Sequence, residues 1–368
     1  MPIELMMLII MSNNSYERLA KILDTIPQGF SPTSSGSHIR LLKLIFRPEE
    51  AELASKMKLR GETSEEMATR LGLEPETLTP LLETMAAKGQ IRAWQSSSGR
   101  RYALLPFVVG IYEEQLDEMD AELAQAFEEY YQENKGFGIF TTEPPIFRVI
   151  PVNKSISTDL EIYPYETAEE MIKSAKSWAV RECICKKQQK ALGNECNYPN
   201  TVCLVMSPRS EHEFDNSELD RVITKNQALD ILHDAEEAGL VHCAMNVVEK
   251  HYYICNCCTC CCGILRGISE FNQPYVLVKS DYVATVDESS CIACGICVDR
   301  CQFEAITIGD IAEINLDRCI GCGVCGIACP EDALSLVERG ERTRPPENMI
   351  DWMTQKAQAR DVDPSDLL

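Results

Sequence analysis

The sequence predicts an α+β protein made of several domains in series. Apolar residues recur at helical spacing through the first third of the chain, and short alternating segments typical of strands follow in the remainder. All nineteen cysteines fall between residues 183 and 329. A chain of 368 residues is long enough for two or three domains with sizeable cores.

Composition narrows the class of protein. The cysteines cluster at metal-ligand spacings rather than spreading as a disulfide framework, which indicates a reducing cytoplasm. The formal net charge of −22 disfavours nucleic acid and favours solubility or a basic protein partner. The apolar segment 1–12 carries Glu4 and is too short to span a bilayer. We therefore expect a soluble, cytoplasmic protein without a membrane span.

Residues 1–34 are predicted to form a helix over 15–25 and a linker rich in serine, glycine and proline. Residues 35–107 form the first predicted domain. Its elements are helices over 38–45, 48–57, 63–72 and 76–88, then a hairpin of 91–95 with 101–105. Thr63 and Glu66 form a capping box for the third helix. Pro80 fits the fourth helix only if that helix starts near Thr77.

This order of helices and hairpin resembles the winged helix of bacterial regulators. The resemblance implies DNA binding, because Arg92, Arg100 and Arg101 lie on the predicted wing and could meet phosphates. The helix predicted over 76–88, which would enter the major groove, instead carries Glu76 and Glu83 on its solvent face, so the DNA would meet carboxylates. DNA binding is therefore an alternative, and a protein-docking or dimerising domain is the favoured interpretation.

Residues 108–136 are predicted to form one long acidic helix. Its apolar residues follow steps of four and three, the seam of a short coiled coil. The seam residues are Val108, Tyr112, Leu116, Met119, Leu123, Ala126 and Tyr130. Two roles are open: homodimerisation through residues 108–135, or packing of the helix on its own domain.

Residues 137–280 are predicted to form a cysteine-rich α+β domain. A helix capped by Thr167 and Glu170 should run to about Trp178, and a second should run from Thr224 to Gly239. The cysteines fall in an upstream set with the spacing C-x-C-x10-C-x6-C and a downstream run of six in eight residues after a strand at 251–254. The ten candidate metal ligands are Cys183, Cys185, Cys196, Cys203, Cys255, Cys257, Cys258, Cys260, Cys261 and Cys262.

Thiols at this density are expected to bind metal, because a free-thiol core would oxidise and packing gives no reason for adjacent cysteines. Iron–sulfur clusters are the favoured occupants, and zinc is the alternative. Adjacent cysteines such as Cys257 and Cys258 point in divergent directions, which suits ligands of different metal atoms or clusters. The flanking cations Arg181, Lys186, Lys187 and Arg266 would offset thiolate charge. Single residues nearby, Cys243, His242 and His251, are more often packing residues than ligands.

Residues 281–340 contain the strongest signal in the chain. Two cysteine runs share the spacing C-x2-C-x2-C-x3-C, and Pro330 completes the second copy. Each run is followed by a short alternating strand, at 305–308 and 333–337, which predicts two related halves. Gly295 and Gly321, with Gly323 and Gly326, allow tight turns that bring backbone N–H groups toward sulfur.

These runs resemble those of bacterial dicluster ferredoxins, over about residues 281–340. In that pattern the fourth cysteine of each run ligates the other cluster. The predicted ligands are Cys291, Cys294, Cys297 and Cys329 for one [4Fe-4S] cluster, and Cys319, Cys322, Cys325 and Cys301 for the other. Paired zinc knuckles are a weaker alternative, because zinc sites use a different spacing. Gln302 stands where many such domains have proline.

The whole layout is similar to a family of multi-cysteine ferredoxin-like proteins of anaerobic bacteria and archaea, marked by RxCxC and ICNCCxCCCGxLR ahead of two ferredoxin runs. That resemblance implies iron–sulfur binding and no particular reaction. Cys261, Cys262 and Gly263 are faintly similar to the CCG modules of heterodisulfide reductases, whose chemistry is not carried over. Residues 341–368 are predicted to be a peripheral tail with a helix over 348–360.

The favoured function is electron transfer between the two ferredoxin-type clusters, the middle cysteine site and a partner oxidoreductase. No phosphate-binding loop and no flavin or nicotinamide fingerprint is seen in the sequence, so hydride chemistry would belong to the partner. One alternative is a redox-sensing transcription regulator with a winged helix. Another is an oxidoreductase, or a subunit of one, with catalysis at the middle cysteines.

Overall fold

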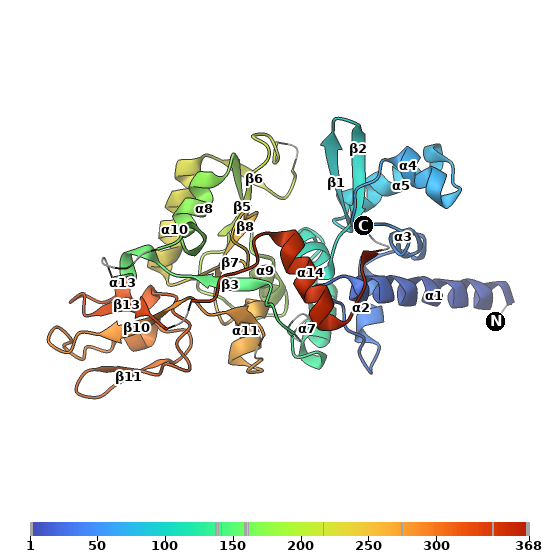
Figure 1. Ribbon diagram of the computed structural model, residues 1–368. Coiled ribbons are helices and arrows are strands. Elements are labelled where there is room, and N and C mark those ends of the chain that lie inside the picture. The colour runs from blue at the N-terminus through green and yellow to red at the C-terminus, as the bar shows by residue number, and fades with distance from the viewer. Residues whose placement is uncertain are drawn as a thin grey trace. The chain divides into compact units, whose positions relative to one another are not determined.

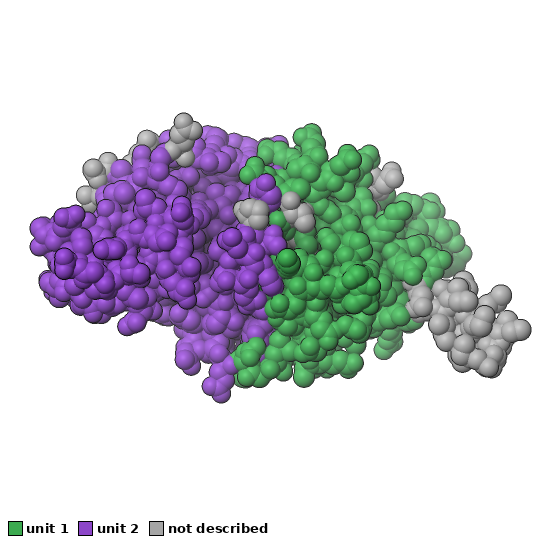
Figure 2. Space-filling model, turned by 90° about the horizontal axis from the view of Figure 1, so that it is seen from below, with its two compact units in different colours: residues 1–143, 190–194, 353–368 green, residues 144–189, 195–352 purple. Residues whose placement is uncertain are grey.

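The computed structural model describes residues 3–136, 138, 140, 142–157, 160, 162–215, 217–273, 275–340 and 342–365, with side chains from residue 14 onward. The described chain mixes helices with mainly antiparallel strands, so the predicted α+β class is confirmed (Figure 1). It divides into two compact units (Figure 2). The first unit comprises residues 1–143, 190–194 and 353–368, and the second comprises residues 144–189 and 195–352.

The first unit begins with the predicted series of helices and a hairpin. The elements are α1 Ile3–Thr25, α2 Ser37–Ile45, α3 Pro48–Ala54, α4 Ser64–Leu71, α5 Pro75–Ala87, β1 Ile91–Ser96 and β2 Gly99–Leu104. The capping box before α4 is confirmed: Thr63 accepts from the Glu66 N–H, and the Glu66 carboxylate accepts from the Thr63 N–H. Helix α1 is longer than predicted. Even so, each helix of the described chain is too short or too polar to cross a bilayer.

The start of α5 corrects one prediction. The helix begins at Pro75, so Pro80 lies inside it rather than in its first turn. Proline at this position removes one backbone N–H donor. Pro75 in the first turn has the backbone φ that a helix start favours. The hydroxyls of Thr79 and Thr84 donate to the Pro75 and Pro80 carbonyls, and the helix continues to Ala87.

The single long helix predicted over 108–136 is wrong. The chain forms a short turn at Phe107–Ile111, then α6 Tyr112–Glu114 and α7 Ala121–Glu133. A new helix starts at Ala121 because the Asp120 carboxylate caps it by accepting from the Leu123 N–H.

The seam residues predicted for that helix are nevertheless buried, because they pack in their own unit. The ring centroids of Tyr112 and Phe127 are 4.8 Å apart, and those of Phe30 and Tyr130 are 4.9 Å apart. This arrangement favours packing on the chain's own domain. Homodimerisation through residues 108–135 stays a prediction.

The hairpin arginines contact carboxylates of the same unit. The Arg100 guanidinium lies 3.0 Å from the Glu83 carboxylate on α5, and Arg101 lies 3.3 Å from Glu66 on α4. Arg92 stacks over the Trp94 ring, with its guanidinium carbon 5.1 Å from the ring centroid. The cations predicted to meet phosphates are therefore engaged with side chains of the protein itself.

The second unit is built on a seven-stranded sheet. Its strands, in spatial order, are β6 Arg221–Ile223, β4 Ser177–Arg181, β5 Cys203–Ser207, β8 Tyr253–Cys257, β7 Val241–Met245, β3 Phe147–Ile150 and β9 Leu277–Val278. Neighbouring strands are antiparallel except β3 and β9. Helices α8 Ala168–Ser174 and α10 Lys225–Ala238 cover one face (Figure 1). The core between them and the sheet contains Met171, Ile172, Val180, Leu204, Met206, Leu232 and Ile254.

Both helices of this face were predicted, but one ends early. The cap predicted for that helix at Thr167 and Glu170 is wrong, because the Thr167 side chain caps no helical N–H and its hydroxyl donates to the Tyr163 carbonyl. The Thr224 and Gln227 capping box and the left-handed Gly239 at the end of α10 are confirmed. Helix α8 stops at Ser174, before the predicted end at Trp178, because Trp178 lies in β4, where it pairs with Met206 of β5. The sheet pairing replaces the last helical turn.

The last part of the second unit consists of two similar halves. Strands β10 Tyr282–Val286 and β13 Leu334–Glu338 pair antiparallel, as do β11 Ile306–Ile308 and β12 Ala312–Ile314. Short helices α12 Ile296–Arg300 and α13 Val324–Ile327 follow the cysteine turns. The strands predicted after each cysteine run are confirmed.

The tail predicted to be peripheral packs against the rest of the chain. Helix α14 Met349–Arg360 forms as predicted, but Trp352 is buried and its indole N–H donates to the Pro145 carbonyl at 2.9 Å. The carbonyls of Pro346 and Glu347 accept from Val248 and Glu249. The prediction failed because the tail is polar in sequence, whereas Trp352 is covered by residues distant in sequence; Ile350 of the same helix stays 75% exposed.

A pH dependence follows from His251, which is buried in the second unit. Burial lowers the pKa of His251 to about 4. The hydrogen bond to the Val248 backbone opposes this shift, and the positive charge of Arg148 adds to it. The unfolded chain takes up a proton near pH 6.5, whereas the folded chain does so only near pH 4, so stability is lost as pH falls between these values. We expect His251→Gln to remove up to about 3 kcal/mol of that acid sensitivity in thermal unfolding. His212→Gln, at a side chain that is 78% exposed, is the control for loss of an imidazole at the surface.

Candidate metal centres

The sheet places cysteines on the face opposite α8 and α10. Leu204, Ile254 and Ala244 point into the helix-covered core from β5, β8 and β7. Side chains alternate along a strand, so the residue next to each of these points to the other face. Those neighbours are Cys203, Cys255 and Cys243, and Cys257 lies on the same face two residues after Cys255. Cys243 is the direct cross-strand partner of Cys255. The register thus gathers thiols from three adjacent strands.

Three further cysteines complete a closed arrangement. Cys183 follows β4, Cys185 lies in the first turn of α9 Ile184–Ala191, and Cys262 precedes α11 Gly263–Ser269. Each thiol hydrogen-bonds to the next around the circle, which we call the six-thiol ring. Its members, in order, are Cys183, Cys203, Cys255, Cys257, Cys262 and Cys185.

Burial and mutual contact disfavour ionisation of the ring thiols. Hydrogen bonds from Cys185 and Cys203, together with burial, raise the pKa of Cys183 well above its ordinary value. The neighbouring thiols Cys185 and Cys257 and burial do the same for Cys262. Thiols with raised pKa values keep their protons at neutral pH, and a metal must displace those protons to bind. The ring therefore suits a metal group with enough positive charge to stabilise several thiolates.

Cys243 was not among the predicted ligands, yet its thiol hydrogen-bonds to Cys257 of the ring. It lies in β7 between His242 and Ala244, in a strand that reads in sequence as ordinary buried core. Only the pairing of β7 with β8 brings it to the ring. No signal in the local sequence separates it from a packing cysteine.

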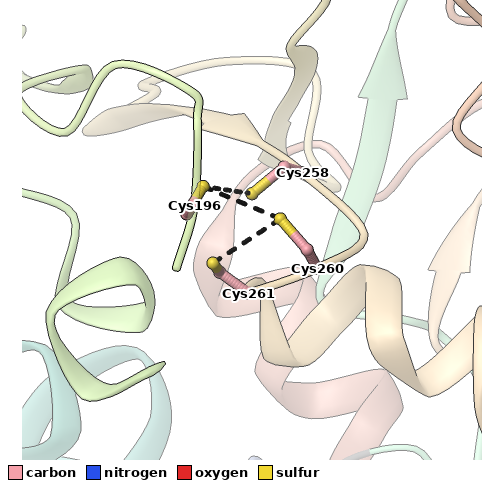
Figure 3. A group of neighbouring side chains, drawn as sticks. All are labelled: Cys196, Cys258, Cys260 and Cys261. Carbon is pink, nitrogen blue, oxygen red and sulfur yellow. Dashed lines mark hydrogen bonds between the residues drawn. The ribbon is translucent and has the colours of Figure 1, made fainter. Parts of the chain in front are cut away.

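The other four predicted middle ligands form a second group, which we call the quartet: Cys196, Cys258, Cys260 and Cys261. Cys196 comes from the loop after α9, and the other three come from the turn between β8 and α11 (Figure 3). The sulfur of Cys196 lies 3.8 Å from that of Cys258 and 3.7 Å from that of Cys260, and Cys260 and Cys261 are 3.7 Å apart. Hydrogen bonds from Cys258 and Cys261 lower the pKa of Cys260. A thiolate is thus already stabilised within the quartet.

The divergence expected of adjacent cysteines is seen at two of three places. Cys257 belongs to the ring and Cys258 to the quartet, and Cys261 belongs to the quartet and Cys262 to the ring. Cys260 and Cys261 instead share the quartet, because the chain turns sharply there after β8. The ten predicted ligands therefore divide into two sites.

One of the four predicted cations lies beside both groups. Lys186 is buried, its ammonium donates to the Pro199 carbonyl at 2.5 Å and it lies over the Tyr198 ring. Burial lowers the pKa of Lys186, but the negative charge that Cys183, Cys258, Cys196 and Cys203 carry when ionised raises it by more, so the net shift is upward. Lys186 thus stabilises thiolate charge in the ring and in the quartet.

The other candidate side chains near the cysteines have structural contacts. Arg181 pairs with Asp220 at 2.6 Å, and Arg266 pairs with Glu270 at 2.6 Å. The His242 ring lies 2.6 Å from the Asn256 amide oxygen and 3.2 Å from the Glu236 carboxylate, on the helix-covered side of the sheet. These partners account for the burial of His242 without a metal.

The eight cysteines of the C-terminal runs lie in two crossed sets. Cys291, Cys294, Cys297 and Cys329 line one hollow. In the other set, burial and the thiolates of Cys325, Cys301 and Cys319 raise the pKa of Cys322. The fourth cysteine of each run therefore lies with the first three of the other run, as the ligand prediction requires.

Backbone donors support thiolate charge in these two sets, which is an observation that fits iron–sulfur clusters. The Ala312 and Ala333 N–H groups donate to the sulfurs of Cys291 and Cys329 at 3.4 and 3.3 Å. The Ala305 N–H donates to the Cys301 sulfur at 3.4 Å. Hydrogen bonds to the sulfurs are one of the means by which a protein sets the potential of a bound cluster.

Polar contacts fix this cluster region against the sheet domain. The Val152 N–H donates to the Cys322 carbonyl at 2.9 Å, and the Ser155 hydroxyl donates to the Gly323 carbonyl at 2.7 Å. Arg148, which is 1% exposed, lies 3.5 Å from the Asp281 carboxylate. Both domains belong to the same compact unit.

Gln302 joins the two cysteine regions directly. Its amide oxygen accepts from the Thr259 N–H at 2.8 Å, and its amide nitrogen donates to the Gly239 carbonyl at the end of α10 at 2.6 Å. Thr259 stands between two quartet cysteines, and Gln302 follows the predicted ligand Cys301. A proline here would lack both amide contacts, so the departure from the usual ferredoxin pattern has a structural consequence.

Comparison with known proteins agrees with the C-terminal sites. Residues 284–307 and 312–335 match the family model of the 4Fe-4S binding domain, and each segment contains one cysteine run. The chain therefore carries two 4Fe-4S binding motifs and has the capacity for iron–sulfur electron transfer. No curated protein and no solved structure matches the chain.

Two glycines of the cluster turns allow a direct test of this site. Gly321 has φ +72°, and a Cβ added there would lie 2.1 Å from the Tyr282 carbonyl oxygen; Gly295 has φ +80°, but a Cβ there would meet nothing within 4 Å. Both alanine variants carry the same left-handed strain of about 1–2 kcal/mol. We expect Gly321→Ala to lose the iron of one C-terminal cluster and Gly295→Ala to retain it, as measured by iron and acid-labile sulfide. Equal iron contents in the two variants would contradict the close packing at Gly321.

Proposed function

We propose that the protein is an electron-transfer protein that connects a partner oxidoreductase, two ferredoxin-type [4Fe-4S] clusters and a further iron–sulfur site in the six-thiol ring. Bound clusters of this kind supply one-electron oxidation and reduction. The chain supplies the thiolates, the surrounding low-dielectric shell and the contacts between sites. The observation that carries the proposal is the Gln302 connection between the two cysteine regions.

The path from Cys301 to the middle domain consists of a few covalent bonds and one hydrogen bond. From Cys301, one peptide bond leads to Gln302, whose side-chain amide oxygen accepts from the Thr259 N–H, and two further peptide bonds lead through Cys258 to the ring cysteine Cys257. Cys257 and Cys262, on either side of this turn, belong to the ring. Electronic coupling is stronger through such a path than across a gap of the same length. The arrangement therefore supports transfer between the cluster held by Cys301 and the middle domain.

The other end of the cluster region is suited to a protein partner. The hollow lined by Cys291, Cys294, Cys297 and Cys329 is bordered by Ile292 and Ile296, which are 62% and 44% exposed. Cys294 is also exposed. Exposed apolar side chains around a redox group favour docking of a redox partner. We propose that electrons enter or leave here, and that the cluster held by Cys301 faces the middle domain.

The relay predicts that Gln302 affects the rate of reduction of the middle site. Leucine has a similar size but cannot form the contacts with Thr259 and Gly239. In Gln302→Leu, we expect dithionite to reduce the two ferredoxin-type clusters as in the wild type, and the middle site to be reduced at least several-fold more slowly. Freeze-quenched paramagnetic resonance distinguishes the sites. Thr307→Val, at an exposed residue on β11, is the matched control, and an unchanged rate in Gln302→Leu would refute the path.

The transcription-regulator alternative has less support, because the hairpin arginines contact Glu83, Glu66 and Trp94 of their own unit. Releasing a guanidinium for a phosphate would break those contacts. We expect no salt-dependent binding to the DNA upstream of the protein's own coding region in either redox state, as measured by fluorescence anisotropy at two salt concentrations. Tight, salt-sensitive binding in one redox state would instead favour the regulator.

A further inference from the structure

We propose that the quartet of Cys196, Cys258, Cys260 and Cys261 holds a single tetrahedral Zn²⁺ ion, separate from the metal group of the six-thiol ring. The middle domain would then contain two metal sites of different kinds. The proposal concerns only the occupant of the quartet and does not depend on the electron-transfer relay.

The sulfur separations carry this inference. Four thiolates around one ion with Zn–S bonds of about 2.3 Å lie about 3.8 Å apart, from the geometry of a tetrahedron. The separations observed are 3.8, 3.7 and 3.7 Å, and all four sulfurs lie within 4.8 Å of one another. The thiolates of a cubane cluster must stand farther apart, because four irons and four sulfides lie between them.

The cysteines of the C-terminal runs provide an internal comparison. All eight lie within the described residues, and they form no group of three with ligand atoms within 4.8 Å of one another. The six-thiol ring forms no such group either, although each of its thiols hydrogen-bonds to its neighbours. An open ring and a compact quartet therefore occur in one domain. The quartet alone has the dimensions of a mononuclear site.

The chemistry of the quartet fits zinc in a structural role. Four cysteine ligands with no water position are typical of closed structural zinc sites. Val202, Ala235 and Leu240 pack around Cys258 and Cys261 and exclude solvent on one side. Four thiolates with Zn²⁺ carry a net charge of −2, and a buried cation, the Lys186 ammonium, lies over the ring of Tyr198, two residues after Cys196. Binding would release the remaining thiol protons to solvent.

A zinc ion here would also fix the turn that faces the ferredoxin-like region. Three of its ligands, Cys258, Cys260 and Cys261, lie next to Thr259, whose N–H donates to Gln302. The fourth, Cys196, comes from a loop 62 residues before Cys258. An ion that joins these two segments would hold the Thr259 N–H in place. The proposed role is therefore to position the connection between the middle domain and Gln302.

Matched double variants test the proposal in the full-length protein purified without oxygen. Cys196→Ala with Cys260→Ala removes two quartet ligands, and Cys185→Ala with Cys203→Ala removes two ring thiols; three of these residues are half-buried and Cys260 is exposed. We expect about one zinc per chain in the wild type. The quartet variant should lose that zinc with iron and acid-labile sulfide unchanged. The ring variant should lose iron and sulfide and keep its zinc.

Cobalt provides a second readout that does not depend on how much zinc is retained. Protein produced with Co²⁺ should show the absorption bands of a tetrahedral cobalt–thiolate centre, and the quartet variant should lack them. The proposal is overturned if the quartet variant loses iron and sulfide together, or if Co²⁺ gives no tetrahedral spectrum in the wild type. Neither measurement depends on reduction of the middle site in Gln302→Leu, so failure of the relay and failure of the zinc site are distinguishable.

Discussion

The alternation of side chains along the strands of the second unit is the constraint on which the rest of the arrangement depends. One face of the sheet carries Leu204, Ile254 and Ala244 into an apolar core under α8 and α10. The same strands send Cys203, Cys255 and Cys243 to the opposite face. A shift of one residue in register would bury thiols among leucines and expose the core. The hydrophobic burial that fixes the register therefore also positions the sulfur atoms.

Charge is the second constraint, because concentrated thiols are useful ligands only when their negative charge is balanced. Burial and thiol neighbours raise the pKa of Cys183 and Cys262, whereas hydrogen bonds lower that of Cys260. Lys186 is the cation that lies beside both groups. In the C-terminal region, backbone N–H groups of Ala305, Ala312 and Ala333 perform a similar role. The two regions thus stabilise thiolates by different means, a buried ammonium in one and peptide dipoles in the other.

The junction between the two regions shows why a departure from a family pattern can be informative. Gln302 stands where proline is usual, and its amide bonds to Thr259 and Gly239. Arg300, two residues earlier, donates to the Glu236 carbonyl at the end of α10 at 2.8 Å. A cation near the final carbonyls of a helix also interacts favourably with the helix dipole. Both contacts attach α12 and the following Cys301 to the middle domain, so the two cysteine regions are joined within the second unit.

The sequence by itself determined the elements and the candidate ligands that depend on local patterns. The C-terminal cysteine runs, the capping boxes at Thr63 and Thr224, the end of α10 at Gly239 and the ten middle cysteines all follow from residue spacing over a few positions. Local chemistry is sufficient there because caps, turns and closely spaced ligands involve neighbours in the chain.

Only the tertiary structure decided how the candidate ligands are divided and what surrounds them. The separation of ring from quartet, the contact of Cys243 with Cys257 and the burial of Trp352 join residues that are distant in sequence. The helix predicted over 108–136 is broken, with α7 capped by Asp120, because the tertiary packing buries the seam residues without keeping them on one helix. Strand pairing and burial depend on many residues at once. The spacing of cysteines in the sequence therefore predicts which residues are candidate ligands, whereas the register of the sheet determines which of them come together.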